Sequence, residues 1–336
     1  MASNKNTNMF FSVIIPLYNK APYVEKALRS VAVQTFSDYE LIVVDDGSKD
    51  DSASVAERVI NDCWLSLSKP RPVKLKRQAN AGVSTARNNG VAASQGQYVC
   101  FLDADDWWEP TFLEEMAKLI AEFPDAGIYG TNYTIINETK HNTRVASVGM
   151  EEGFEKGYIN YCRVYAKTMY MPLSSITVSI PRKVFDEMQG FKPHLKLGED
   201  FDLWIRIALK YKVAFLNKSL ANYNQDVDVV NRGTCHLHKP ENHMLWNLGY
   251  LEGEEKTNCD YKQLIDNLRA FSLLPYYLSD EYHEAAKREL DKVDWSRQTA
   301  KNRRMFRLPI WLLKGKNQIR NVGSDLKRMI MKVVWK

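Results

Sequence analysis

The sequence lacks any apolar run that approaches the 18 or more residues needed to cross a bilayer. Its first residues, Met1–Asn8, are polar and contain no apolar signal-peptide core, so we expect residues 1–10 to be a short disordered lead. These absences argue against an integral membrane protein and predict a cytoplasmic location.

Cysteine is scarce, and its pattern excludes a common kind of metal site. The five cysteines are scattered, odd in number, and never form a Cys-x-x-Cys pair. This usage fits a reducing compartment and argues against a thiolate zinc site. The cysteines are Cys63, Cys100, Cys162, Cys235 and Cys259.

Apolar strands and amphipathic helices alternate from Phe11 to Tyr133. Such alternation predicts an α/β fold with a mostly parallel sheet flanked by helices, and ligands of such sheets lie at the carboxyl ends of the strands. The predicted strands are Ser12–Pro16, Leu41–Asp45, Val73–Arg77 and Tyr98–Leu102, and the predicted helices are Pro22–Val33, Asp51–Asp62 and Val83–Ala93.

The rest of the chain has a less regular pattern. We expect an irregular segment over residues 222–243 and then a C-terminal helical extension, with two amphipathic helices over residues 260–294. Before that segment, the expected strands are Gly127–Tyr133, Arg144–Val148, Ser175–Ile180 and Val213–Leu216, and the expected helices are Phe154–Lys167, Pro181–Met188 and Glu199–Tyr211.

Three carboxylates follow the strand Tyr98–Leu102 directly, at Asp103, Asp105 and Asp106. Carboxylates at a strand end are costly unless they are solvated, capped or bound to a cation. Mg²⁺ and Mn²⁺ prefer oxygen ligands of this kind and often bridge one or two carboxylates to substrate phosphates. The alternative is that Asp105 or Asp106 caps the helix that follows.

The ends of the other predicted strands carry further polar or aromatic groups. Tyr18 follows the first strand, Asp46 follows the second, and Arg87 lies one turn into the helix after the third. An aromatic platform, an acceptor for a base or ribose, a guanidinium and a metal site together describe a pocket for a nucleotide diphosphate. Taken singly, each residue has a structural alternative, such as an ordinary strand-to-helix turn at Asp46.

This set of motifs resembles the family 2 glycosyltransferases, which have the Rossmann-like GT-A fold. The matching segments cover residues 11–115 densely and in the family's order, and they are 12–19, 34–40, 43–48, 80–88 and 101–106. The resemblance implies a glycosyltransferase domain over residues 11–225, with a nucleotide-binding half (11–115) and an acceptor half (116–225). Residues 226–300 would then form an irregular segment and a helical extension.

The resemblance also implies roles for single residues. A divalent cation, Mn²⁺ or Mg²⁺, would be the cofactor. Base and ribose would be held by Pro16, Tyr18, Asp46 and Arg87, the ribose or sugar by Asp103, and the cation on the diphosphate by Asp105.

A second acidic motif, Glu199-Asp200, lies at the start of a predicted helix. In the resembled family the Asp of this pair is the general base, so the resemblance implies that role for Asp200. A base and a metal-held leaving group imply a single displacement that inverts the anomeric carbon. The alternative is that these acids only complement the helix dipole.

The sequence departs from the resembled family at one place. Many relatives carry a His about 25 residues after the Glu-Asp pair, whereas residues 221–225 here read Ala-Asn-Tyr-Asn-Gln. The next histidines are His236 and His238, which we expect to be solvated in a loop rather than to bind the metal. The third metal ligand is therefore not identified by sequence.

The C-terminal 36 residues, 301–336, account for the net positive charge of the chain. They contain eleven Lys or Arg and a single acid, Asp325, so they contribute +10 to a total of +5, and the first 300 residues carry −5. Apolar residues recur at helical spacing in this basic tail, as in an amphipathic helix on an anionic membrane. The alternative is a helix that docks on the body or mediates dimerisation. Nucleic acid is not expected as a partner, because no matching motif accompanies the charge.

Together these features predict an inverting, metal-dependent glycosyltransferase. It would move a sugar from a nucleotide-diphosphate donor, a UDP-sugar, to a hydroxyl of a glycan or lipid-linked glycan in surface polysaccharide biosynthesis. It would be peripheral on the cytoplasmic face of the inner membrane. Two alternatives stay open: a sugar-phosphate nucleotidyltransferase, although Pro16–Lys20 is not its Gly-rich loop, and an inactive nucleotide-sugar-binding scaffold.

Overall fold

The computed structural model describes residues 9–64, 71–227 and 237–314. They divide into two compact units, one ending at Met244 and the other beginning at Leu245. Residues 1–8 of the predicted lead (1–10) and residues 315–336 of the predicted basic amphipathic tail (301–336) lie outside the described residues. No helix in the described ranges is both long enough and apolar enough to span a membrane.

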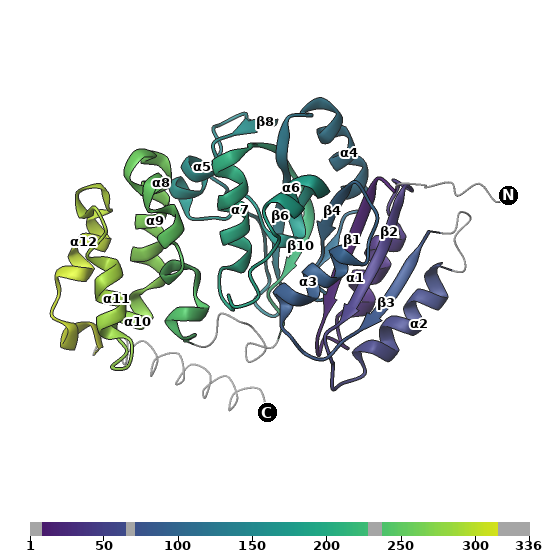
Figure 1. The fold of residues 1–336 in the computed structure, drawn as a ribbon, viewed down its shortest axis with the longest axis horizontal. Coiled ribbons are helices and arrows are strands. Elements are labelled where there is room, and N and C mark those ends of the chain that lie inside the picture. The colour runs from purple at the N-terminus through teal and green to yellow at the C-terminus, as the bar shows by residue number, and fades with distance from the viewer. Residues whose placement is uncertain (1–8, 65–70, 228–236, 315–336) are drawn as a thin grey trace. The chain divides into compact units, whose positions relative to one another are not determined.

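The first unit is built on a ten-stranded sheet with the order β3-β2-β1-β4-β9-β6-β10-β5, with β7 paired to β6 and β8 paired to β10 (Figure 1). Strands β1 to β4 form its parallel half, as the alternation predicted. Their bounds are β1 Phe11–Leu17, β2 Tyr39–Asp45, β3 Val73–Arg77 and β4 Tyr98–Phe101, and the helices between them are α1 Val24–Ala32, α2 Ser52–Trp64 and α3 Val83–Ala92.

The second half of the sheet is mixed. Strand β9 runs antiparallel to both β4 and β6, while β6 and β10 pair in parallel. The strands are β5 Trp107–Trp108, β6 Ala126–Asn137, β7 Asn142–Val145, β8 Lys156–Ile159, β9 Val178–Pro181 and β10 Lys212–Asn224. The helices of this half are α4 Phe112–Glu122, α5 Tyr161–Thr168, α6 Arg182–Glu187 and α7 Glu199–Lys210.

Helices cover both faces of the parallel half. Every residue of β2 and all but one of β1 are buried, because each face of these strands packs against helices. Val13 and Ile15 join the apolar cluster of α1 and α2, and on the other face α3 approaches so closely that a Cβ on Gly90 would clash with Ile14 Cγ2. This packing fixes the strand ends at which the polar residues lie.

Three expectations for the second half were wrong in part. The helix expected over 154–167 is strand β8 followed by α5, and the Asn160 side chain caps α5 by accepting from Arg163 N at 3.0 Å. The strand expected over 175–180 begins as a short 3₁₀ turn. Strand β10 continues to Asn224, into the segment expected to be irregular, and register shifts between Leu216 and Ala221 interrupt the alternation that would have revealed it.

The second unit is helical. Where two helices were expected over residues 260–294, the structure has three, because the turn at Leu273 and Pro275 separates the first from the second. Phe271, expected on the same side as Leu264 and Leu268, is 72% exposed. The helices are α8 Glu252–Thr257, α9 Cys259–Ser272, α10 Leu274–Tyr277, α11 His283–Leu290 and α12 Ala300–Arg307.

Candidate functional site

One cavity of about 720 Å³ opens at the carboxyl ends of β1, β2 and β4 and at the start of α7. This is the edge of the sheet at which the sequence predicted a ligand. Every residue predicted for the site lines this strand-end cavity: Pro16, Tyr18, Asp46, Arg87, Asp103, Asp105 and Asp200. Tyr18 is 39% exposed, so this aromatic residue is partly accessible at the cavity wall.

Asp46 is buried and organises the loop that follows β3. Its Oδ1 accepts from Gln78 Nε2 and from Ala81 N, and its Oδ2 accepts from Gly82 N, all at 2.8 Å. A carboxylate offers about four lone-pair positions, so three of them are already used within the protein. Asp46 therefore shapes the wall of the cavity and has capacity for about one further hydrogen bond.

Arg87 is 3% exposed and joins two segments that lie far apart in the sequence. Its Nη2 donates to Asp103 Oδ1 at 2.8 Å, and its Nη1 donates to Glu199 Oε1 at 3.1 Å. Burial alone would lower the pKa of Arg87, but the carboxylates of Asp103 and Glu199 outweigh it and raise that pKa. The guanidinium is a permanent positive charge that ties the end of β4 to the first turn of α7.

The three carboxylates after β4 have three different environments. Asp105 pairs with Lys20, with 2.6 Å between Nζ and Oδ2, while Asp103 pairs with Arg87. Asp106 is 3% exposed, and its Oδ1 accepts from Asn224 N at 2.7 Å. Burial, followed by the neighbouring Asp105 and Asp103, raises the pKa of Asp106 well above its usual value. Asp106 thus anchors β10, and Asp103 and Asp105 are the more accessible carboxylates at the cavity.

Asp200 lies in the first turn of α7. The residue before this helix, Gly198, has a left-handed backbone conformation with φ +80°. Asp200 Oδ1 accepts from Phe201 N at 2.8 Å. Burial, and then the negative charge of Glu199, raises the pKa of Asp200 to about 7. A carboxylate with such a pKa is suited to take up a proton near neutral pH.

The donor set at the cavity fits a hard divalent cation that completes its coordination with other ligands. The described residues contain no cluster of three or more His, Cys, Asp or Glu side chains able to hold a metal. Mg²⁺ is typically bound by one or two carboxylates together with substrate phosphates, and Asp105 and Asp103 supply that number. His238 does not line the cavity, and His236 lies outside the described residues.

The charge balance of the cavity also favours a bound cation. Six carboxylic side chains line it, against three cationic ones, namely Lys20, Arg87 and Lys196. Even with Asp106 protonated, the lining carries an excess of negative charge. An anionic diphosphate would be repelled there unless a cation accompanied it.

Sequence reasoning missed several residues of the cavity. Lys20 immediately follows the matched motif 12–19, so its position was visible although its pairing with Asp105 was not. Lys196 comes from the loop before α7, and its Nζ is 3.0 Å from the point where a Cβ on Gly82 would lie. No motif marks Lys196, because its place depends on a contact across more than a hundred residues.

Comparison with known proteins agrees with this architecture. The family model described as glycosyl transferase family 2 matches residues 12–180, half of the chain. The chain belongs to glycosyl transferase family 2. The matched region includes every site residue described above except those of the loop before α7, of α7 itself and of β10.

Two curated relatives of this family 2 chain are also glycosyltransferases by description. The glycosyltransferase GlyA of Streptococcus pneumoniae serotype 4 is 33% identical over 219 residues, which cover 63% of this chain and 30% of the relative. An uncharacterized glycosyltransferase of Rickettsia conorii is 30% identical over 223 residues, which cover 66% of this chain and 34% of the relative. The chain thus matches about a third of the length of these relatives.

The GT-A-type fold of this family 2 member is shared with a solved structure. TarS residues 1–349 from S. aureus, crystallised in complex with UDP-GlcNAc, superimposes with a TM-score of 0.69 at 19% identity. The superposition covers 84% of this chain and 80% of TarS 1–349. The expected fold class, a mostly parallel α/β sheet flanked by helices, is confirmed.

Proposed function

We propose that this family 2 member is an inverting, metal-dependent hexosyltransferase that uses a nucleotide-diphosphate sugar, specifically a UDP-sugar. The acceptor is a hydroxyl of a glycan or lipid-linked glycan in surface polysaccharide assembly. The observation that carries the proposal is that Asp105 and Asp200 line one cavity, each from a different part of the chain. The complex of the TarS structure with UDP-GlcNAc supports the choice of donor.

The nucleotide lies against the walls nearest β1 and β2. Tyr18 stacks on the base beside Pro16, and the remaining lone pair of Asp46 accepts from the base or ribose. Arg87 holds Asp103 in place, and Asp103 reaches the ribose or the sugar with its second oxygen. Residues 11–115 act as the nucleotide-binding half, and residues 116–225 complete a transferase domain by shaping the acceptor site.

Asp105 would hold the divalent cation, with Asp103 as the neighbouring carboxylate. When bound, the cation offsets the negative charge that develops on the departing diphosphate. The pairing of Asp105 with Lys20 holds this carboxylate in position.

Asp200 removes the proton of the acceptor hydroxyl. As its carboxylate takes that proton, the acceptor oxygen bonds to the anomeric carbon and the bond from that carbon to the diphosphate oxygen breaks, with the electron pair leaving on the diphosphate. Attack from the side opposite the leaving group inverts the anomeric carbon. General-base assistance of this kind is typically worth about 10²–10⁴-fold in rate.

The basic tail, residues 301–336, associates with an anionic membrane surface, which places the enzyme peripherally on the cytoplasmic face of the inner membrane. Support comes from α12, where four of eight residues are Lys or Arg and none is acidic. Trp311, shortly after this helix, is 69% exposed. Basic residues with exposed aromatic side chains are typical of interfacial segments.

Thermal unfolding with a panel of nucleotides and nucleotide sugars, with and without Mn²⁺, tests the donor site. A ligand at about 100 times its Kd stabilises the folded state by about 2.7 kcal/mol. We expect UDP or a UDP-sugar to raise the Tm only with Mn²⁺. In Asp105→Asn, this Mn²⁺-dependent rise in Tm should disappear. The exposed residue Asp186 supplies a control variant, Asp186→Asn, which should respond like the wild type.

If no nucleotide raises the Tm at concentrations well above millimolar, the carboxylates after β4 are structural and the transferase proposal fails. A shift with a nucleoside triphosphate and a sugar phosphate, but with no nucleotide sugar, would support a nucleotidyltransferase instead. Donor binding without transfer to any acceptor would support an inactive scaffold.

A further inference from the structure

A second cavity, of about 300 Å³, lies in the helical unit between α11 and α12. Three aromatic side chains form its apolar part: Trp295 and Phe306 have ring centroids 4.9 Å apart, and Tyr277 and Phe306 have centroids 5.7 Å apart. Apart from Leu290, its remaining lining is charged. We call it the α11–α12 pocket, and its charged lining residues are Lys287, Asp291, Arg303 and Arg307.

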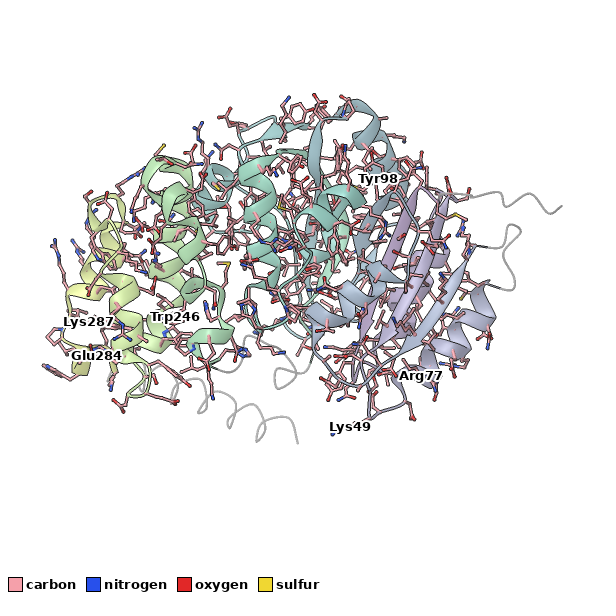
Figure 2. The ribbon with its side chains drawn as sticks, in the orientation of Figure 1. Lys49, Arg77, Tyr98, Trp246, Glu284 and Lys287 are labelled. Atoms are coloured by element: carbon pink, nitrogen blue, oxygen red, sulfur yellow. The ribbon has the colours of Figure 1, made fainter. Side chains whose placement is uncertain are left out.

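Three cations against one carboxylate leave this pocket with an excess of positive charge. Within the described ranges, Lys287 and Arg307 make no ion pair or side-chain hydrogen bond. Glu284 lies one turn before Lys287 on α11 (Figure 2), yet no ion pair joins them. These two charges are therefore available to an external anion.

Arg303 is held in place without losing its charge. Its Nη1 donates to the carbonyl oxygens of Ser296 and Gln298, at 3.1 and 2.6 Å. Because both acceptors are neutral, the guanidinium keeps its full positive charge at the pocket while its orientation is fixed. A fixed guanidinium beside two free cations is the arrangement that recognises phosphate oxygens.

The segment after α12 carries an exposed aromatic side chain on an anchored backbone. Leu313 is buried, and Lys314 Nζ pairs with Asp280 Oδ1 at 2.5 Å, while Trp311 between α12 and this anchor is 69% exposed. Beyond it, residues 315–336 add six Lys or Arg and one Asp to the sequence. The pocket is thus followed directly in the chain by residues suited to a membrane interface.

We infer that the α11–α12 pocket binds the phosphate of an anionic lipid headgroup. The three cations bind the phosphate oxygens, and the aromatic rings pack against the glycerol portion of the headgroup. The chemistry is that of any phosphate ester, and the neighbouring Trp311 and basic tail favour a lipid as its source. The inference rests on the proposed membrane association and is independent of the proposed transfer reaction.

The experiment compares two variants with equal net charge in a vesicle flotation assay. One, K287Q/R307Q, removes two pocket charges. The other, R288Q/K301Q, removes two charges from the same helices at exposed positions outside the pocket. The vesicles contain phosphatidylcholine with or without phosphatidylglycerol, and the full-length protein is used throughout.

We expect the wild type to float only with phosphatidylglycerol, and K287Q/R307Q to bind about 25-fold more weakly, at about fivefold for each charge. R288Q/K301Q should retain most of the binding. Equal loss in the two variants would show diffuse attraction alone and overturn the pocket, while leaving the membrane association intact. Failure of the wild type to float would also overturn it. So would a rise in the Tm of the protein with inorganic phosphate that is as large as the rise with the vesicles.

Discussion

Replacing Asp200 by asparagine should separate the activity of the enzyme from its stability. The Asp200 side chain lines the strand-end cavity, and its Oδ1 accepts from Phe201 N at 2.8 Å. Asparagine has the same shape and keeps that acceptor oxygen, but it cannot take up a proton from a hydroxyl. We therefore expect Asp200→Asn to bind the donor and to lose about 10²–10⁴-fold in kcat.

The same substitution should stabilise the protein above neutral pH. Burial and the charge of Glu199 raise the pKa of folded Asp200 from its ordinary 3.8 to about 7. Folding thus favours the protonated carboxyl, so the stability of the wild type falls as the pH rises from about 4 through 7. A pKa difference of about three units, at about 1.36 kcal/mol for each unit, lowers the free energy of unfolding by at most about 4 kcal/mol above pH 7.

Asparagine does not ionise and avoids this cost. We expect the Tm of Asp200→Asn to exceed that of the wild type at pH 8 and to equal it near pH 4, measured by scanning calorimetry. Wild-type transfer should increase with pH toward a plateau above 7, because only the ionised carboxylate acts as a base. The control variant Asp186→Asn, at an exposed position, should change neither the Tm nor the rate of transfer. Wild-type kcat in Asp200→Asn, or a lower Tm at pH 8, would refute the reasoning.

Two further predictions concern the buried arginines of the two units. Arg87→Lys removes the forked guanidinium that reaches both Asp103 and Glu199. We therefore expect urea unfolding to show a free energy of unfolding lower by about 1.5–3 kcal/mol, the value of one charge-assisted hydrogen bond. An unchanged midpoint would contradict the bridging role. Arg269, 2% exposed, pairs with Glu255 and Glu289, and Arg269→Met should destabilise the protein by about 1.5–3 kcal/mol, because it removes charge-assisted hydrogen bonds and leaves Lys262 and Lys292 as the cations paired with these carboxylates. A loss below about 1 kcal/mol in the same assay would show that these carboxylates are solvated without it.

The parallel half of the sheet was predictable because its signals are local. The strands β1 and β2 are short apolar runs, buried on both faces, and each is followed within a few residues by a polar turn and a helix. Strand β8 could not be recognised in this way. Its residues, Lys156–Ile159, are partly exposed, and they form a strand only because they pair with β10 far along the chain.

The candidate site was predictable as a set of positions, but its internal bonding was not. Asp46, Asp103 and Asp105 could be placed because each follows a strand whose end lies at the ligand-binding edge of the sheet. The partner of Arg87 on α7, Glu199, lies 112 residues away in the sequence. Contacts of such separation depend on the packing of the whole unit, and no local pattern encodes them.

The partners of each carboxylate distinguish the roles that identical side chains can play in one cavity. Asp46 accepts three hydrogen bonds from the loop after β3, and Asp106 is buried with a raised pKa, so both are structural parts of the cavity wall. Asp103 faces a buried guanidinium that cannot move away, whereas Asp105 faces a lysine, a single mobile ammonium that a divalent cation can displace. Asp200 accepts from one backbone amide and has no cation paired with it among the described residues. It alone combines a pKa near 7 with unoccupied lone pairs, and those are the two properties that a general base requires.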